Sequence, residues 1–217
     1  MKKNIDVLVF DFDGVLVDTG LDIANAMNYV LRHYALPELP PQRIISFIGR
    51  GAGKLVEDSL GEGKLHLLDQ ALEMFLQRYS EYYLVDTSLY PGVKEVLAHY
   101  HQAGKTLAIA TQKAEPITHS ILAGLGIKQY INLVIGPESV THRKPHPESI
   151  LKILQQTGTD PGRLIFVGDM VTDIQAGKAA GVITCAVTYG LGQRVDLEAA
   201  QPDFLINQLM ELCDLIV

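Results

Sequence analysis

The sequence predicts an α/β protein with a parallel sheet and an inserted helical domain. Short apolar runs, typical of buried parallel strands, alternate with amphipathic stretches in the second half of the chain. A long segment with helical periodicity alone separates the first apolar run from the others. We therefore expect a doubly wound, Rossmann-like core formed by residues 1-15 and 86-217, interrupted by a helical domain of residues 16-85.

The first half of the chain contains one strand signal and then helices. The apolar run from Asp6 to Phe10 predicts a buried strand. Apolar residues then recur at three-and-four spacing from Leu21 to Tyr34, which predicts a helix that ends before Pro37. The same spacing continues between Gln42 and Leu84 without a β-rich run, so this block is expected to be all helical.

The second half alternates between strand and helix signals. Short apolar runs at residues 106–110, 133–135, 164–167 and 182–187 predict strands. Amphipathic stretches separate or follow them at residues 93–101, 117–125, 147–156 and 173–180. Because parallel neighbours need crossover connections, this order predicts a parallel sheet with helices on both faces.

Composition excludes several classes of protein. A net charge of -7 over 217 residues argues against a nucleic-acid partner, which would need a concentrated basic surface. The first apolar run is interrupted by Asp6 and Asp11, which leaves it too short to be a signal peptide or to span a bilayer. We therefore expect a cytoplasmic protein without a membrane partner. Cys185 and Cys213 lack metal-site spacing and are expected to be structural thiols in a reducing compartment.

Polar and charged residues follow the predicted strands. Asp11 and Asp13 follow the first strand, and alternation places them on the same side of an extended backbone. The ends of later strands and one stiff loop supply Thr111, Gln112, Lys144, Asp169 and Asp173. Each has a local explanation, such as a helix cap or a solvated loop charge. Together they predict a ligand site, because ligands bind at the carboxyl ends of parallel strands.

Phosphoryl transfer to a carboxylate uses this set of groups. A phosphate dianion is repelled by an aspartate, so a hard cation such as Mg²⁺ must screen its approach, with Asp11 and Asp169 as the natural ligands. Lys144 would add positive charge, and the Thr111 hydroxyl would bind the phosphate oxygens. Asp13 would act as general acid and then general base, while Gly14 permits a tight turn below the site.

The motifs that carry these residues resemble those of the haloacid dehalogenase superfamily of phosphohydrolases. They are Asp11-Phe12-Asp13-Gly14-Val15-Leu16-Val17-Asp18-Thr19, Thr111-Gln112-Lys113, Lys144-Pro145 and Gly168-Asp169-Met170-Val171-Thr172-Asp173. The resemblance implies that Asp11 is the nucleophile and that Asp13 is the acid/base and a magnesium ligand through its carbonyl. It also implies phosphate binding by Thr111 and Lys144, magnesium binding by Asp169, direct or water-mediated binding by Asp173, and a helical cap at 16-85.

Within this superfamily the chain looks like a phosphoglycolate phosphatase. An aspartate at position 13 favours phosphate esters over dehalogenation, by resemblance. The segment Phe47 to Glu57 is similar to the substrate-specificity loop of phosphoglycolate phosphatases, so Arg50 and Lys54 would meet the substrate carboxylate. Gln112 and Met170 stand where relatives commonly have Asn and Ser, which bears on fine substrate positioning.

Other functions are compatible with the same motifs. A phosphomutase acting on a sugar phosphate would keep them all, as would a pyrophosphatase or a broad-specificity sugar or nucleotide phosphatase. A non-enzymatic phospho-receiver is a distant alternative, since it lacks a helical insertion of this size.

No histidine is assigned a role, because no pair has zinc-site spacing beside a vacant carboxylate. The expected partner is a small phosphorylated metabolite, and the chain is a possible homodimer.

Overall fold

The computed structural model describes residues 2–217, which form two compact units. One unit contains the chain up to Val17 and Leu89–Val217, and the other contains Asp18–Ser88. The chain passes between the units through two short paired strands, β2 (Val17–Asp18) and β3 (Ser88–Leu89). The sequence predicts limits of 16 and 85 for the helical unit. In the structure this unit begins two residues later, at Asp18, and ends three residues later, at Ser88.

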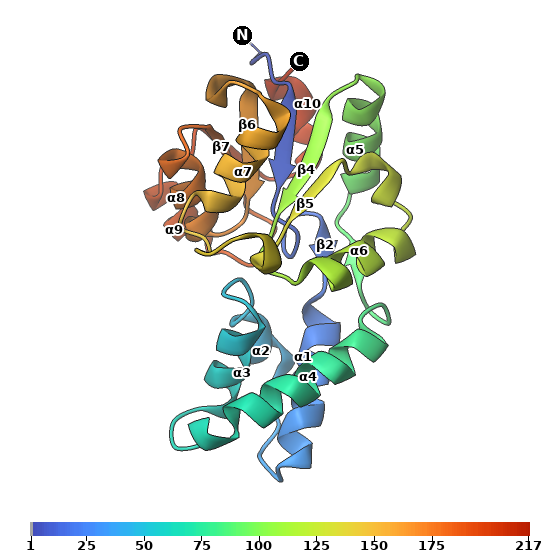
Figure 1. Ribbon diagram of the computed structural model, residues 1–217, viewed down its shortest axis with the longest axis vertical. Coiled ribbons are helices and arrows are strands. Elements are labelled where there is room, and N and C mark those ends of the chain that lie inside the picture. Colours follow the sequence, from blue (N-terminus) through green and yellow to red (C-terminus); the bar gives the residue numbers. More distant parts are fainter. Residues whose placement is uncertain (1) are drawn as a thin grey trace. The chain divides into compact units, whose positions relative to one another are not determined.

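The larger unit is built on a six-stranded parallel sheet, which confirms the predicted fold class (Figure 1). Its strands are β1 (Val7–Phe10), β4 (Thr106–Ala110), β5 (Leu133–Ile135), β6 (Leu164–Gly168), β7 (Ile183–Val187) and β8 (Phe204–Ile206). They lie in the order β5-β4-β1-β6-β7-β8. Strand β1 therefore pairs with β4 on one side and β6 on the other, so the chain reverses its direction of winding beside β1.

Helices connect and cover these strands. They are α5 (Val93–Gln102), α6 (Glu115–Gly124), α7 (Glu148–Thr157), α8 (Val171–Ala179), α9 (Arg194–Ala199) and α10 (Leu212–Leu215). Short 3₁₀ turns are η2 (Lys128–Tyr130), η3 (Pro137–Ser139), η4 (Pro161–Arg163) and η5 (Leu209–Glu211). Helices α5 to α8 coincide within three residues at each end with the amphipathic stretches of the sequence.

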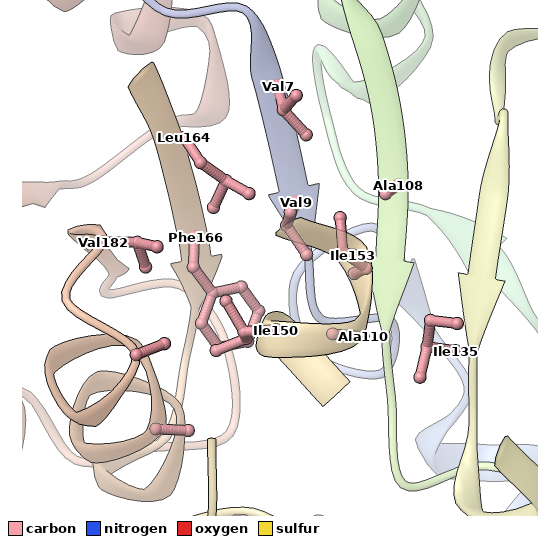
Figure 2. Packing of buried hydrophobic residues seen from close by; sticks show 12 residues of the cluster. Val7, Val9, Ala108, Ala110, Ile135, Ile150, Ile153, Leu164, Phe166 and Val182 are labelled. Atoms are coloured by element: carbon pink, nitrogen blue, oxygen red, sulfur yellow. The ribbon is translucent and has the colours of Figure 1, made fainter. Parts of the chain in front are cut away.

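The core of this unit is packed on both faces of the sheet. On one face, Val9 and Phe166 of neighbouring strands lie against Ile150 and Ile153 of α7 (Figure 2). Alternation turns Phe10 toward the opposite face, and it is also fully buried. Burying both faces explains why these strands have continuous apolar sequences rather than alternating ones.

The smaller unit consists of helices, as its sequence periodicity predicts. They are α1 (Gly20–His33), α2 (Pro41–Ile45), α3 (Ala52–Leu60) and α4 (Leu68–Tyr82), with the 3₁₀ turn η1 (Leu65–Leu67) before α4. Helix α1 packs against α2 and α4, and α3 packs against α4. In the part of the chain that is described, no helix combines the length and apolar character needed to cross a membrane.

Candidate active site

Asp11 lies directly after β1 and is almost fully buried. Its backbone N–H donates to the Val167 carbonyl at 2.9 Å, which continues the strand pairing by one residue. Its Oδ1 accepts a 2.7 Å hydrogen bond from the Phe12 N–H, and its Oδ2 lies 2.9 Å from Lys144 Nζ. Burial raises the pKa of Asp11 to about 7, against the opposing effect of the Lys144 ammonium.

Lys144 is the buried cation of the site. Its Nζ lies 2.9 Å from Asp11 Oδ2 and 2.7 Å from Asp173 Oδ1, and it donates to the Ala110 carbonyl at 3.0 Å. Burial alone would lower the pKa of Lys144, but Asp11 and Asp173 outweigh it and hold this pKa above its usual value. The ammonium therefore remains charged at neutral pH and joins the end of β4 to two carboxylates.

Asp169 follows β6 and is fully buried. Its Oδ2 accepts a 2.7 Å hydrogen bond from the Leu191 N–H, whereas its Oδ1 is buried without a hydrogen-bond partner among residues 2–217. Burial, with smaller effects from Asp173 and Asp11, raises the pKa of Asp169 well above its ordinary value. Burying a carboxylate oxygen without a hydrogen-bond partner costs folding free energy. This cost indicates that Asp169 Oδ1 binds a ligand.

Glycines make room for Asp169. Gly14 has a φ of 85°, and a Cβ at this position would overlap Asp169 Oδ2. A Cβ on Gly190 would overlap the same side chain. Small residues in the first loop and in the loop after β7 therefore allow the backbone to close around this carboxylate.

Asp173 both caps a helix and belongs to the charged cluster. Its Oδ2 accepts a 2.9 Å hydrogen bond from the Met170 N–H at the start of α8, so it caps that helix. Its Oδ1 contacts Lys144, so the same side chain also belongs to the charged cluster. The adjacent Gly168 is required by this arrangement, because a Cβ there would overlap Asp173.

The three carboxylates fit a divalent cation. Asp11, Asp169 and Asp173 each offer an oxygen, and these oxygens all lie within 4.8 Å of one another. Lys144 supplies one positive charge for three buried carboxyl groups, so the cluster as a whole favours a further cation. Oxygen-only donors suit a hard ion such as Mg²⁺.

Thr111 and Gln112 follow β4 at the same edge of the sheet. The Thr111 N–H donates to the Ile135 carbonyl at 3.0 Å, and its hydroxyl oxygen accepts from the Lys113 N–H at 3.1 Å. Gln112 is half-buried in the turn between them. Thr111 thus lies at the end of the strand beside β1, where the sequence places it.

Asp13 has a different charged partner from the three clustered carboxylates. Its Oδ1 is 3.1 Å from Lys113 Nζ, and both side chains are largely buried. Lys113 belongs to the motif Thr111-Gln112-Lys113, from which no role was predicted for it. The signal was its position two residues after Thr111, but the pairing with Asp13 depends on a side-chain direction that spacing does not determine.

Arg50 and Lys54 belong to the helical unit and have acidic partners there. Arg50 Nη2 lies 2.5 Å from Asp58 Oδ2. Lys54 Nζ lies 2.9 Å from both Glu57 Oε1 and Asp58 Oδ1, and the Glu57 and Asp58 hydrogen bonds raise the pKa of Lys54. Both cations are partly exposed, so an anion could replace these contacts.

The loop after β7 supports the site through contacts that were not predicted from the sequence. The Tyr189 hydroxyl donates to the Val15 carbonyl at 2.8 Å, and the Leu191 N–H holds Asp169 as described above. Gly192 is also confined, since a Cβ there would overlap the Asp169 backbone. The repeated glycines were the available signal, but their contacts are long-range in sequence.

Comparison with curated proteins finds relatives along nearly the whole chain. Phosphoglycolate phosphatase from Pectobacterium atrosepticum is 35% identical over 213 residues, covering 96% of this chain and 91% of the relative. Phosphoglycolate phosphatase from Chromobacterium violaceum is 34% identical over 219 residues, covering 99% and 97% of the two chains. These matches extend over nearly the whole chain, including the residues of its helical unit, rather than over the core alone.

Solved structures and a family model agree with these relatives. A crystal structure described as a predicted phosphoglycolate phosphatase from Haemophilus somnus superimposes with a TM-score of 0.90 at 27% identity, covering 97% of both chains. The family model described as haloacid dehalogenase-like hydrolase matches residues 8–187, which contain all four motifs. The resemblance predicted from those motifs is confirmed: the chain belongs to the haloacid dehalogenase-like hydrolases and is a phosphatase of that family.

Proposed function

We propose that this phosphatase hydrolyses 2-phosphoglycolate through an aspartyl phosphate on Asp11, with Mg²⁺ as its cofactor. The observation that carries the proposal is the buried cluster of Asp11, Asp169 and Asp173 around Lys144 at the ends of parallel strands. The substrate is inferred from relatives named phosphoglycolate phosphatase that match this chain over nearly its full length.

In the first half of the reaction, a carboxylate oxygen of Asp11 attacks phosphorus. The new bond forms as the bond from phosphorus to the ester oxygen breaks, and Asp13 gives its proton to the departing alkoxide. Lys144 and the Thr111 hydroxyl bind the phosphoryl oxygens and stabilise charge that develops on them. The products of this half are free glycolate and a phosphorylated Asp11.

In the second half, water replaces Asp11 on phosphorus. Asp13, now a carboxylate, takes a proton from the water whose oxygen attacks the phosphoryl group. The bond between phosphorus and Asp11 breaks, which returns the Asp11 carboxylate and releases inorganic phosphate. The 3.1 Å contact of Asp13 Oδ1 with Lys113 Nζ would orient the Asp13 side chain for these proton transfers.

Asp11, Asp169 and the Asp13 carbonyl would hold Mg²⁺, with Asp173 as a direct or water-mediated ligand. The buried Asp169 Oδ1, which has no hydrogen-bond partner among the described residues, is the atom that most favours this assignment. When bound, Mg²⁺ would screen the repulsion between the phosphate dianion and the attacking carboxylate.

Substrate selection is assigned to Arg50 and Lys54. Both are cations near the start of α3, and the glycines at positions 49 and 51 flank Arg50 with φ values of 103° and 85°. Their present partners, Asp58 and Glu57, are carboxylates, so the carboxylate of 2-phosphoglycolate has the right chemistry to replace them.

The test is phosphate release from 2-phosphoglycolate, pyrophosphate, sugar phosphates and nucleoside monophosphates, with Mg²⁺ and with excess EDTA. We expect one strong, magnesium-dependent activity on 2-phosphoglycolate. Arg50→Ala should raise KM for this substrate about tenfold, the effect of one lost charged contact of roughly 1.4 kcal/mol. Arg32→Ala is the matched control, because Arg32 forms a comparable exposed ion pair with Glu38 in the same unit.

Other outcomes would contradict specific parts of the proposal. Weak activity on many substrates would reject the substrate but keep the chemistry. An isomerised sugar phosphate appearing without free phosphate would instead identify a phosphomutase. Full activity in excess EDTA would reject the metal.

A further inference from the structure

A second cluster of possible metal ligands lies on the loop that carries Lys144. His142 and His146 are exposed, and Glu148 begins the helix α7 that follows. Each offers a ligand atom, and these atoms lie within 4.8 Å of one another. The two imidazole rings have centroids 4.5 Å apart and are inclined at 34°. From the sequence, no histidine pair was expected beside an available carboxylate, but the folded loop brings Glu148 to both.

Glu148 is held firmly in this position. Its Oε1 accepts a 2.9 Å hydrogen bond from the Thr141 N–H, and its Oε2 accepts a 2.8 Å bond from the His142 N–H. Its Oε1 also lies 3.4 Å from Lys152 Nζ. The carboxylate is thus fixed before any ligand arrives, and Oε2 is the oxygen that contacts the His142 ring.

The spacing of the donor atoms suits a tetrahedral ion. His142 Nδ1 lies 3.1 Å from Glu148 Oε2. Two ligands of one tetrahedral zinc ion are about 3.4 Å apart, given metal–ligand bonds of roughly 2.0–2.1 Å. His146 Nδ1 accepts a long hydrogen bond of 3.3 Å from the Glu148 N–H, so this exposed ring loses little when it turns toward an ion.

We propose that His142, His146 and Glu148 form a binding site for a borderline transition-metal ion such as Zn²⁺. Two imidazole nitrogens and one carboxylate oxygen distinguish this cluster from the oxygen-only cluster of Asp11, Asp169 and Asp173. Imidazole nitrogen favours Zn²⁺, Ni²⁺ or Cu²⁺ over Mg²⁺. Three protein ligands leave a fourth position for water. Because its ligands precede and follow Lys144 in the sequence, the bound ion would restrain the loop that carries Lys144.

Calorimetric titration of Zn²⁺ into the full chain, with Mg²⁺ at saturating concentration, tests this site. The wild type should bind one zinc ion. In both His142→Gln and His146→Gln the affinity for zinc should fall at least about tenfold, or binding should be lost. His119→Gln is the matched control, because His119 is exposed on α6 outside the cluster, and it should bind zinc like the wild type.

Copper provides a second readout that does not depend on activity. With Cu²⁺ as the probe, electron paramagnetic resonance should show coupling to imidazole nitrogen in the wild type and a loss of that coupling in the His142→Gln/His146→Gln double variant. Equal zinc binding by the wild type and the double variant would overturn the proposal and assign the ion to the aspartates. No zinc binding at 1 mM, on the order of the weakest useful affinity, would also overturn the proposal and leave only the 3.1 Å contact between His142 Nδ1 and Glu148 Oε2.

Discussion

At the residue scale, the site concentrates unfavourable burial at a few atoms. Three carboxyl groups within 4.8 Å of one another are buried, and burial raises the pKa of both Asp11 and Asp169. Such groups cost stability unless a cation compensates them. Lys144 compensates two of them directly, which makes it the structural centre of the cluster as well as a proposed phosphate ligand.

Asp11→Asn tests the nucleophile. The amide is nearly isosteric but cannot form the aspartyl phosphate, so we expect kcat to fall at least about 10³-fold. Circular dichroism should show that the variant remains folded. Asp196→Asn, an exposed change on α9, should keep full activity. Near-normal turnover by the Asp11 variant would remove this residue as the nucleophile.

Gly14→Ala tests the packing around Asp169. The new Cβ would overlap Asp169 Oδ2 and also require an unfavourable φ of 85°. Gly126→Ala is the matched control, because Gly126 has a φ of 67° but no atom within 4 Å of a Cβ. The control should lose about 1–2 kcal/mol of unfolding free energy from the backbone alone. Gly14→Ala should lose roughly 1–3 kcal/mol more in urea unfolding; equal losses would contradict the close packing.

The sequence predicts which residues form the cluster better than it predicts their contacts. Asp11, Thr111 and Asp169 follow parallel strands, and the topology alone brings strand ends together. The ion pair of Lys113 with Asp13 depends on side-chain rotamers and could not be derived from spacing. The acidic partners of Arg50 and Lys54 could not be derived from the sequence either, because they depend on the turn before α3 and on the faces of that helix.

At the element scale, one buried side chain joins the two ends of the helical unit. Asp22 of α1 accepts hydrogen bonds at 3.0–3.1 Å from the backbone N–H groups of Val85, Asp86 and Thr87, and one at 2.8 Å from the Thr87 hydroxyl. It therefore fixes the segment where the chain leaves this unit. A carboxylate suits the task because it accepts several hydrogen bonds and donates none.

Asp22→Ala should lower the melting temperature of the protein. Removing the carboxylate leaves buried N–H groups without their acceptor, at a cost of about 1–3 kcal/mol for each one that stays dry. Asp69→Ala, an exposed change in the first turn of α4, should shift the melting temperature much less. Differential scanning calorimetry measures both melting temperatures. Equal values for the two variants would contradict the role assigned to Asp22.

The loop that carries Lys144 should add an acid-sensitive contribution to stability. Hydrogen bonds from the Thr141 and His142 N–H groups lower the pKa of Glu148 to about 2. Since its folded-state pKa is depressed, the contribution is present above the ordinary pKa of about 4.5 and is lost as pH falls toward 2. Glu148→Gln should therefore be less stable than the wild type at pH 7, with the difference shrinking in acid.

Urea unfolding of both proteins at several pH values measures that difference. Glu95→Gln, an exposed change on α5, is the control and should follow the wild type at every pH. A constant difference between the wild type and Glu148→Gln from pH 7 to pH 3 would contradict the assigned hydrogen bonds.

Secondary structure was predictable where the apolar residues formed a clear local pattern. Residues 106–110 and 133–135 are strands with the expected limits, because each is a short apolar run buried in a parallel sheet. Strand β8, Phe204–Ile206, was not predicted, although its apolar run has the same three-residue length as that of β5. The paired strands β2 and β3 have two residues each and depend on tertiary pairing alone.

At the scale of the whole molecule, the residues proposed for chemistry and those proposed for substrate selection belong to different units. The parallel sheet brings together the groups proposed for phosphoryl transfer. The helical unit, Asp18–Ser88, contains the cations proposed to recognise the rest of the substrate. Sequence periodicity indicates this division because the helical insertion interrupts an otherwise regular alternation of strands and helices. Substrate identity is harder to predict, since it depends on a few side chains in the inserted unit.

The most direct measurement is chemical trapping of the phosphorylated enzyme. The protein is mixed with 2-phosphoglycolate and Mg²⁺, quenched in acid, reduced with borohydride and analysed by peptide mass spectrometry. Borohydride converts an acyl phosphate of aspartate to homoserine, so the proposed mechanism predicts homoserine at position 11, dependent on substrate. Turnover without any modified aspartate, or modification at another aspartate instead, would contradict the assignment of Asp11 as the nucleophile.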